Sequence, residues 1–228
     1  MDFLGGEIIL INKPLNWTSF QVVNKLRYSI RHKLGVKKIK VGHAGTLDPL
    51  ADGLLIICTG KKTKEIDSFM GLQKTYTGIV TLGANTPSYD LESEISETFD
   101  IDHLNDEKIF SAAKNMIGWQ EQMPPIFSAK KIDGQRAYNL AREGKDVELK
   151  PKRVEISVFE ITKINLPEVH FKIACSKGTY IRSIAYDFGK TLNAGGHLSA
   201  LRREQIGEYK LSDALEINDF LDRVSKME

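Results

Sequence analysis

Apolar and polar residues alternate along several segments of this chain with the period of two that β-strands produce. Residues 74–82 show it best, because one face would carry Tyr76, Gly78, Val80 and Leu82. The glycine there leaves space beside Tyr76, where another ring could lie. Further strands are predicted where alternation or a short apolar run is bounded by turn residues, at residues 7–11, 54–58, 154–164, 169–175 and 197–207.

Other segments have the 3.6-residue period of helices. The first helix follows Thr18 and Gln21, which match a capping box, and ends at Gly35. Its apolar face is formed by Val22, Leu26 and Ile30. A second helix is predicted at residues 107–117, ending at Gly118 and burying Ile109, Phe110, Ala113 and Ile117.

A third helix begins after residues 176–180 and carries a continuous apolar stripe of Ile181, Ile184, Ala185, Phe188 and Leu192. Arg182 lies one residue off this stripe, in the first turn. A cation is unfavourable beside the positive end of the helix dipole, so Arg182 indicates an anionic partner rather than an ordinary surface position.

A short amphipathic helix is expected at residues 218–224, and a further helix is expected to contain Arg136, Tyr138 and Arg142 after an Asp133–Gly134 turn.

One loop, at residues 42–53, combines three glycines with His43, Asp48 and Pro49 between two apolar runs. Proline disfavours the helical region for the residue before it and fixes its own φ, so the backbone of Asp48 is held in one orientation. A plain Asp-Pro turn is the structural alternative.

The order of the loop residues, Gly-His-Ala-Gly-Thr-Leu-Asp-Pro-Leu-Ala-x-Gly, resembles the signature of the TruB family of tRNA pseudouridine synthases. Three other stretches are similar to the same family: Lys-x-Tyr-x-Gly at residues 74–78, Ser-Lys-Gly-Thr-Tyr-Ile-Arg-Ser at 176–183, and Leu-Arg-Arg at 201–203. Residues 123–138 also follow it. The resemblance extends over residues 7–209.

The resemblance implies roles for individual residues. Asp48 would be the nucleophile, paired with Arg182, while Tyr76 and Tyr180 hold the detached base. Without the resemblance, Tyr76 reads equally well as a core aromatic residue. His43 would fill or brace the space that the flipped base leaves, and Leu201 would contact that base. Lys13, left at a strand end before a proline, is a further substrate-binding candidate.

The resemblance also implies the fold and the reaction. The fold would be α+β, with a mixed, largely antiparallel sheet, flanking helices and a central active-site cleft. The substrate would be uridine 55 in the T-loop of tRNA, bound through the T-arm. Breaking the bond from ribose C1′ to N1 and joining C1′ to C5 involves no redox change and no outside group. No cofactor is therefore required, and no residue is assigned to a metal.

A chain of 228 residues with 41% apolar residues can bury one sizeable core, so we expect a single catalytic domain over residues 1–228. Residues 210–228 would form a short tail, and the RNA-binding PUA domain of longer family members is expected to be absent. The two cysteines, Cys58 and Cys175, lie in apolar runs and indicate core positions and no disulfide. With no signal or membrane segment, we expect a cytoplasmic monomer.

The charge is segregated rather than large. Lys and Arg total 32 against 30 acids, yet residues 76–107 hold eight acids and neither Lys nor Arg. Residues 90–106 therefore read as an exposed acidic loop. The basic residues gather at 25–40 and 130–153, which suits a phosphate backbone, although a solvated helix face is the alternative.

Three other functions compete with this interpretation. The Gly-x-x-Gly at residues 42–45 matches the loop of a KH RNA-binding module, but a strand precedes it and an aspartate follows it closely. A nucleoside hydrolase would need a carboxylate cluster, whereas the loop offers only Asp48 and Asp52. The guide-dependent archaeal and eukaryotic relatives of the family are the third alternative.

Overall fold

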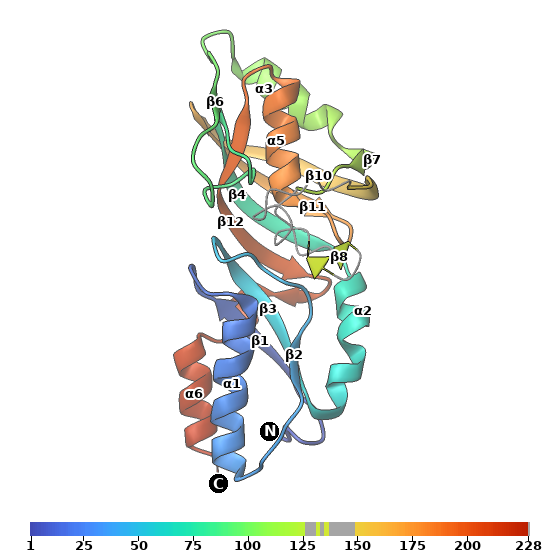
Figure 1. The fold of residues 1–228 in the computed structure, drawn as a ribbon, viewed down its shortest axis with the longest axis vertical. Coiled ribbons are helices and arrows are strands. Elements are labelled where there is room, and N and C mark those ends of the chain that lie inside the picture. The colour runs from blue at the N-terminus through green and yellow to red at the C-terminus, as the bar shows by residue number, and fades with distance from the viewer. Residues whose placement is uncertain (126–130, 133–134, 137–148, 228) are drawn as a thin grey trace. The chain divides into compact units, whose positions relative to one another are not determined.

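The computed structural model describes residues 1–125, 131–132, 135–136 and 149–227, which fall into two compact units (Figure 1). The first unit comprises Met1–Tyr76 and Leu201–Glu228, and the second comprises Thr77–Ala200. Strands β4 (Lys74–Leu82) and β12 (Gly196–Ile206) contribute residues to both units. Each unit is described by itself.

Strand β3 (Ala51–Thr59) is the centre of the first unit. It pairs antiparallel with β1 (Ile8–Lys13) and β2 (Val41–His43), and parallel with the end of β12, where Leu201 lies opposite Ala51. Every residue of β3 from position 53 onward is buried, because both of its faces are covered. A short strand β13 (Tyr209–Lys210) returns along β12.

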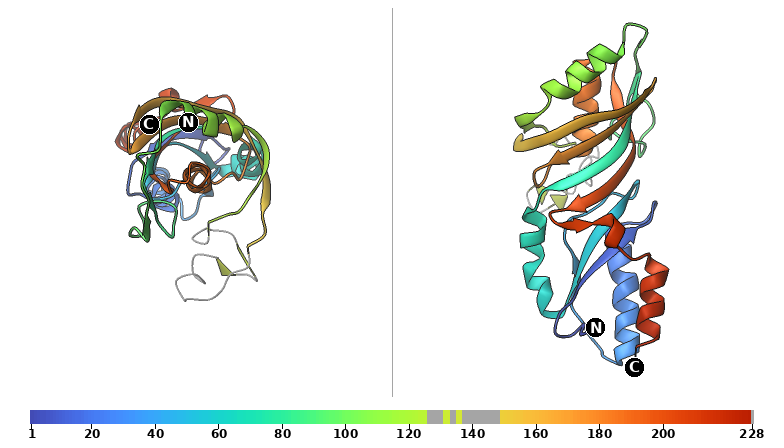
Figure 2. Two further views of the ribbon diagram at one scale, coloured as in Figure 1. Left: turned by 90° about the horizontal axis from the view of Figure 1, so that it is seen from above. Right: turned by 180° about the vertical axis from the view of Figure 1, so that it is seen from behind.

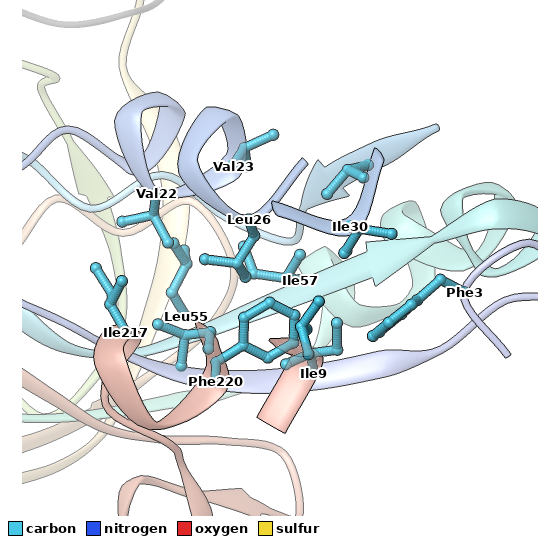
Figure 3. Packing of buried hydrophobic residues seen from close by; sticks show 13 residues of the cluster. Phe3, Ile9, Val22, Val23, Leu26, Ile30, Leu55, Ile57, Ile217 and Phe220 are labelled. Atoms are coloured by element: carbon cyan, nitrogen blue, oxygen red, sulfur yellow. The ribbon is translucent and has the colours of Figure 1, made fainter. Parts of the chain in front are cut away.

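Two helices lie side by side in this unit, α1 (Ser19–Leu34) and α6 (Ile217–Ser225) (Figures 1 and 2). Helix α1 begins with the expected capping box, and Gly35 ends it in the left-handed conformation with a φ of 63°. Side chains from α1, α6, β1 and β3 meet in one apolar cluster, in which Leu26 and Phe220 are completely buried (Figure 3). The shorter helices are η1 (Gly60–Glu65), α2 (Ile66–Gly71) and η2 (Leu211–Asp213).

The second unit has the strand order β12–β4–β11–β10–β7, where β11 is Glu168–Cys175, β10 is Lys152–Asn165 and β7 is Gly118–Gln122. Strands β10 and β11 form an antiparallel pair, and β10 also pairs antiparallel with β7. Helix α5 (Ile181–Thr191) buries the whole predicted stripe, and its Phe188 ring lies 5.3 Å from that of Phe159 on β10. This unit also contains α3 (Asp106–Asn115) and two small hairpins, β5 (Ala84–Asn85) with β6 (Glu97–Thr98), and β8 (Lys131–Ile132) with β9 (Gln135–Arg136).

The predicted α+β class with a mixed, mostly antiparallel sheet is confirmed, and the predicted strands all occur. The alternation on β11 is confirmed too, since Val169, Phe171, Ile173 and Cys175 are buried. Strand β3 begins three residues earlier than predicted, at Ala51, so Asp52 belongs to a strand.

Three details of the sequence interpretation were wrong. Phe110 and Ile117 are exposed, because α3 turns Ile109, Ala112 and Ala113 inward and ends at Asn115. Arg136 lies in a strand, and the rest of its predicted helix, with the Asp133–Gly134 turn, is outside the described residues.

The third concerns packing: within the acidic loop at 90–106, Asp90 is buried rather than exposed.

The space predicted beside Gly78 is occupied by a ring, as expected, since a Cβ there would come within 2.6 Å of the Phe171 ring and 2.4 Å of the Ala200 carbonyl.

Both cysteines are free and buried, as predicted, and burial raises the pKa of the Cys58 thiol to about 11. Among the described residues, no helix is long and apolar enough to cross a membrane.

Replacing Leu26 with alanine should lower the free energy of unfolding by about 2 to 5 kcal/mol, because it opens a cavity in the α1–α6 cluster. Chemical denaturation would measure the loss. Tyr28→Ala is the matched control, because Tyr28 lies two residues further along the same helix and its side chain is exposed. This substitution should change the free energy of unfolding by roughly 0.5 kcal/mol or less. Equal losses in the two variants would contradict the assignment of the cluster as the core of this unit.

Candidate active site

The Asp48 loop, residues 44–50, joins β2 to β3 in the first unit, and hydrogen bonds hold it on both sides of the aspartate. The Ser19 hydroxyl accepts from the Leu47 N–H at 2.8 Å and lies 3.1 Å from the Leu47 carbonyl, to which it donates. The Asn16 N–H donates to the Pro49 carbonyl at 2.8 Å. Because the residues immediately before and after Asp48 are both tied to the start of α1, the carboxylate stands on a fixed backbone.

A buried arginine ties the two ends of this segment together. The Arg203 side chain donates from Nε to the Leu54 carbonyl at 2.7 Å and from Nη2 to the Gly45 carbonyl at 3.0 Å. Only 1% of the residue is exposed. Gly53 allows this approach, since a Cβ there would lie 2.5 Å from the Arg203 carbonyl oxygen. A guanidinium can serve both carbonyls because its donors form a rigid fork.

Two further candidates from the sequence lie near this loop. Lys13 is fully buried, and its ammonium donates to the carbonyls of Pro14, at 2.9 Å, and Trp17. Burial lowers the pKa of Lys13 to about 8, while the charges of Asp52 and Asp48 oppose that shift. The amine therefore orders the chain before α1 and contributes positive potential near Asp48.

The His43 ring is held neutral. Burial lowers the pKa of His43, and the nearby charge of Arg203 lowers it further, against a backbone hydrogen bond with Gly45. Its Nδ1 is buried without a hydrogen-bond partner among the described residues. This nitrogen is shielded from solvent by its surroundings.

Tyr76 and Leu201 complete the sequence-predicted residues of the first unit. Leu201 pairs with Ala51, three residues after Asp48, and is partly exposed. Tyr76 is 9% exposed on β4. Two residues before it, the buried Lys74 donates to the carbonyls of Met70 and Leu72, both at 2.6 Å, and so fixes the end of α2 to the start of β4.

In the second unit Arg182 is buried and has an anionic partner, as its place in the sequence indicated. Its Nη1 lies 3.4 Å from Oδ2 of Asp90 and donates to the Ser88 carbonyl at 3.3 Å. Both side chains are less than a tenth exposed. Two oxygens from residues 88 and 90 thus hold Nη1 of Arg182 in place.

The other predicted residue of this unit, Tyr180, is the N-cap of α5. The Gln122 side chain holds its backbone on both sides, accepting from the Tyr180 N–H at 2.8 Å and donating to its carbonyl at 3.0 Å. Beside Arg182, the rings of Tyr89 and Tyr186 stack with centroids 4.2 Å apart. Tyr89 has a φ of 63°, which is unusual for a bulky residue and marks a conformation imposed by its surroundings.

The structure thus brings Asp48, His43, Lys13 and Leu201 together in one unit and places Arg182 and Tyr180 on one helix start in the other. The pairing of Asp48 with Arg182 stays a prediction. Sequence reasoning missed Arg203, Asp90 and the tyrosine pair. No group of three or more His, Cys, Asp or Glu in the described part of the chain is arranged to hold a metal.

Because the Arg203 charge depresses the basicity of His43, Arg203→Met should raise the pKa of the His43 imidazole. NMR titration of the histidine ring would measure the change. Arg202→Met is the matched control. The Arg202 guanidinium is half-exposed and pairs with Asp52 at 2.6 Å, and its loss should leave the His43 pKa nearly unchanged. An unchanged His43 pKa in a folded Arg203→Met protein would contradict the proximity of the two charges.

Comparison with known proteins gives a consistent result. Residues 31–181 match the model of the TruB family pseudouridylate synthase N-terminal domain. The tRNA pseudouridine synthase B of Flavobacterium johnsoniae is 54% identical over 220 residues, which are 96% of each chain. The enzyme of the same name from Phocaeicola vulgatus is 53% identical over 228 residues, all of this chain and 97% of that one.

Two solved structures share the fold, each with a TM-score of 0.70. One is a Cbf5–Nop10–Gar1 complex, which is 25% identical over 96% of this chain. The other is an H/ACA ribonucleoprotein bound to a substrate RNA containing 2′-deoxyuridine, which is 23% identical over 99% of this chain. This chain covers 54% and 57% of those longer chains. With a matched family model over most of its length and relatives more than half identical from end to end, the chain belongs to the TruB family of pseudouridylate synthases.

Proposed function

We propose that this chain converts uridine 55 in the T-loop of tRNA to pseudouridine, with Asp48 as the nucleophile. The observation that carries the proposal is the Asp48 loop, held on both sides of the carboxylate, in a chain whose full-length relatives are named tRNA pseudouridine synthase B. The reaction is an isomerisation, so the product has the atoms of the substrate.

The chemistry requires a carboxylate that attacks the ribose or assists cleavage of the bond from C1′ to N1. A nucleophile on a mobile loop would lose much of its advantage, because catalysis by proximity depends on a fixed geometry. Ser19, Asn16 and Arg203 supply that geometry from three directions.

The carboxylate must also stay ionised when the substrate covers it. Removal from water favours the neutral acid, and a guanidinium beside it opposes that change. Arg182 is the cation we assign to this role. Asp90 and the Ser88 carbonyl hold Nη1 of Arg182, which restricts where its guanidinium can lie.

The detached base must be held while it turns, and the RNA stack that it left must be stabilised. Base flipping costs a few kcal/mol, and side chains that replace the lost stacking recover part of it. We assign the base contacts to Tyr76, Tyr180 and Leu201, and the vacated space to His43, whose neutral ring can stack or donate a hydrogen bond. Lys13 would act as a cation beside the loop.

We further propose that the chain acts as a monomer on the T-arm, in the cytoplasm. Its two buried, unpaired thiols are those of a reducing compartment.

Asp48→Asn should abolish pseudouridine formation in a tRNA transcript, because the amide keeps the shape of the carboxylate but cannot act as the nucleophile. The affinity for tRNA should change by less than about threefold, since the substitution removes no contact made in the ground state. Mass spectrometry of nucleosides and a binding titration give the two readouts. Turnover near that of the unaltered chain would overturn the assignment, and free uracil in place of pseudouridine would identify a hydrolase.

The same assay tests the substrate, with the isolated T-arm hairpin compared with whole tRNA. If the T-arm carries recognition, the hairpin alone should be modified at its uridine 55. A hairpin that stays unmodified under conditions where whole tRNA is converted would refute this part of the proposal.

Asp90→Asn should slow the reaction by at least about tenfold at saturating tRNA while leaving the fold intact, because Arg182 loses the charge that orients it. Single-turnover kinetics would measure the effect. Glu168→Gln is the matched control, since its carboxylate lies in the same unit, is about half exposed and lies 3.7 Å from His170. Equal rates for both variants would show that the Asp90 contact has no part in catalysis.

A further inference from the structure

A basic pocket lies in the first unit beside the strand that carries His43. It has a volume of about 780 Å³ and is open to solvent. Its walls come from α1, the segment between α1 and β2, β2 itself, and the start of α2. Five of its lining residues are cations and none is acidic: Arg27, Arg31, Lys37, Lys38 and Lys40.

One of these cations is fixed before any ligand arrives. Arg27 donates from Nη1 to the Asn24 side chain at 3.1 Å and from Nη2 to the Val41 carbonyl at 3.1 Å. The other four are exposed. A half-buried, anchored arginine surrounded by exposed lysines and a second arginine is suited to an anion with several oxygens in succession.

Five like charges around one hollow repel each other, and the fold provides no acid within the pocket to offset them. The ligand must therefore bring the negative charge. The pocket also includes Gly42, which directly precedes His43 in β2. The pocket therefore reaches the strand that leads into the Asp48 loop.

We propose that this pocket binds backbone phosphates of the T-arm, next to the nucleotide that is flipped toward Asp48. The proposal rests on the proposed function, because it takes the RNA at His43 to be the substrate. Phosphate contacts fix the register of an RNA on a protein without reading its sequence. The pocket thus sets where the RNA enters, while the Asp48 loop and the base contacts select the uridine.

The test is the double charge reversal Lys37→Glu, Lys38→Glu. Both residues are exposed and lie outside helices and strands, so the fold should persist. The KM for the T-arm hairpin should rise by at least about tenfold, whereas kcat at saturating RNA should change by less than about twofold, because phosphate contacts are made equally in the ground and transition states. The slope of log affinity against log salt should become shallower by about one to two.

The matched control is Lys210→Glu, Lys226→Glu, which reverses two exposed lysines of the same unit that do not line the pocket. Both double variants lower the net charge by the same amount, so a general electrostatic effect would weaken binding equally. Equal changes in the pocket pair and the control pair would overturn the proposal. An effect on whole tRNA that is missing with the hairpin would also overturn it, since the T-arm would not be the ligand.

Failure of the proposed function can be told apart from failure of this inference. Hairpin affinity measured by fluorescence anisotropy does not depend on turnover, so it compares the two double variants even if no pseudouridine forms. An unaltered chain that makes no pseudouridine contradicts the function. A pocket pair that binds the hairpin as tightly as the control pair contradicts the pocket.

Discussion

The candidate site of the first unit depends on one buried guanidinium. Arg203 donates to the carbonyls of Gly45 and Leu54, which lie before and after Asp48 in the chain. A buried charge is tolerated only where its hydrogen bonds are well made, and here the acceptors are backbone carbonyls rather than a carboxylate. The arrangement leaves the positive field of Arg203 available to the loop, where it adds to the effect of burial in lowering the pKa of His43.

The second unit uses the opposite arrangement. Arg182 is buried against a carboxylate, Asp90, and against the Ser88 carbonyl, so its charge is partly compensated and its orientation is fixed. The flanking Tyr89 adopts a left-handed backbone between these two contacts and stacks on Tyr186, one turn of α5 beyond Arg182. The positive φ of Tyr89 thus accompanies the placement of the Ser88 carbonyl and the Asp90 carboxylate on the same guanidinium. In both units an arginine is placed by oxygens from distant parts of the chain.

Periodicity and capping chemistry could be read from the sequence with good accuracy, because they depend on neighbours along the chain. Helix α1 begins at its capping box and ends at its glycine as predicted, and the α5 stripe is buried at every position. The motifs around Asp48, Tyr76 and Arg182 indicated the family that the comparisons show, while the roles of these three residues stay predictions.

What failed depends on partners that the local sequence does not contain. Phe110 faces solvent because the partners of α3 select a different stripe, and Asp90 is buried because Arg182 lies 92 residues later in the sequence. Arg203 was missed because its acceptors are main-chain carbonyls, which every residue possesses.

The burial of Cys58 and Cys175 has a practical consequence: neither thiol competes for a maleimide reagent in the folded chain. A single cysteine introduced at the exposed Thr46 would therefore accept a fluorophore selectively and report on whatever approaches the Asp48 loop.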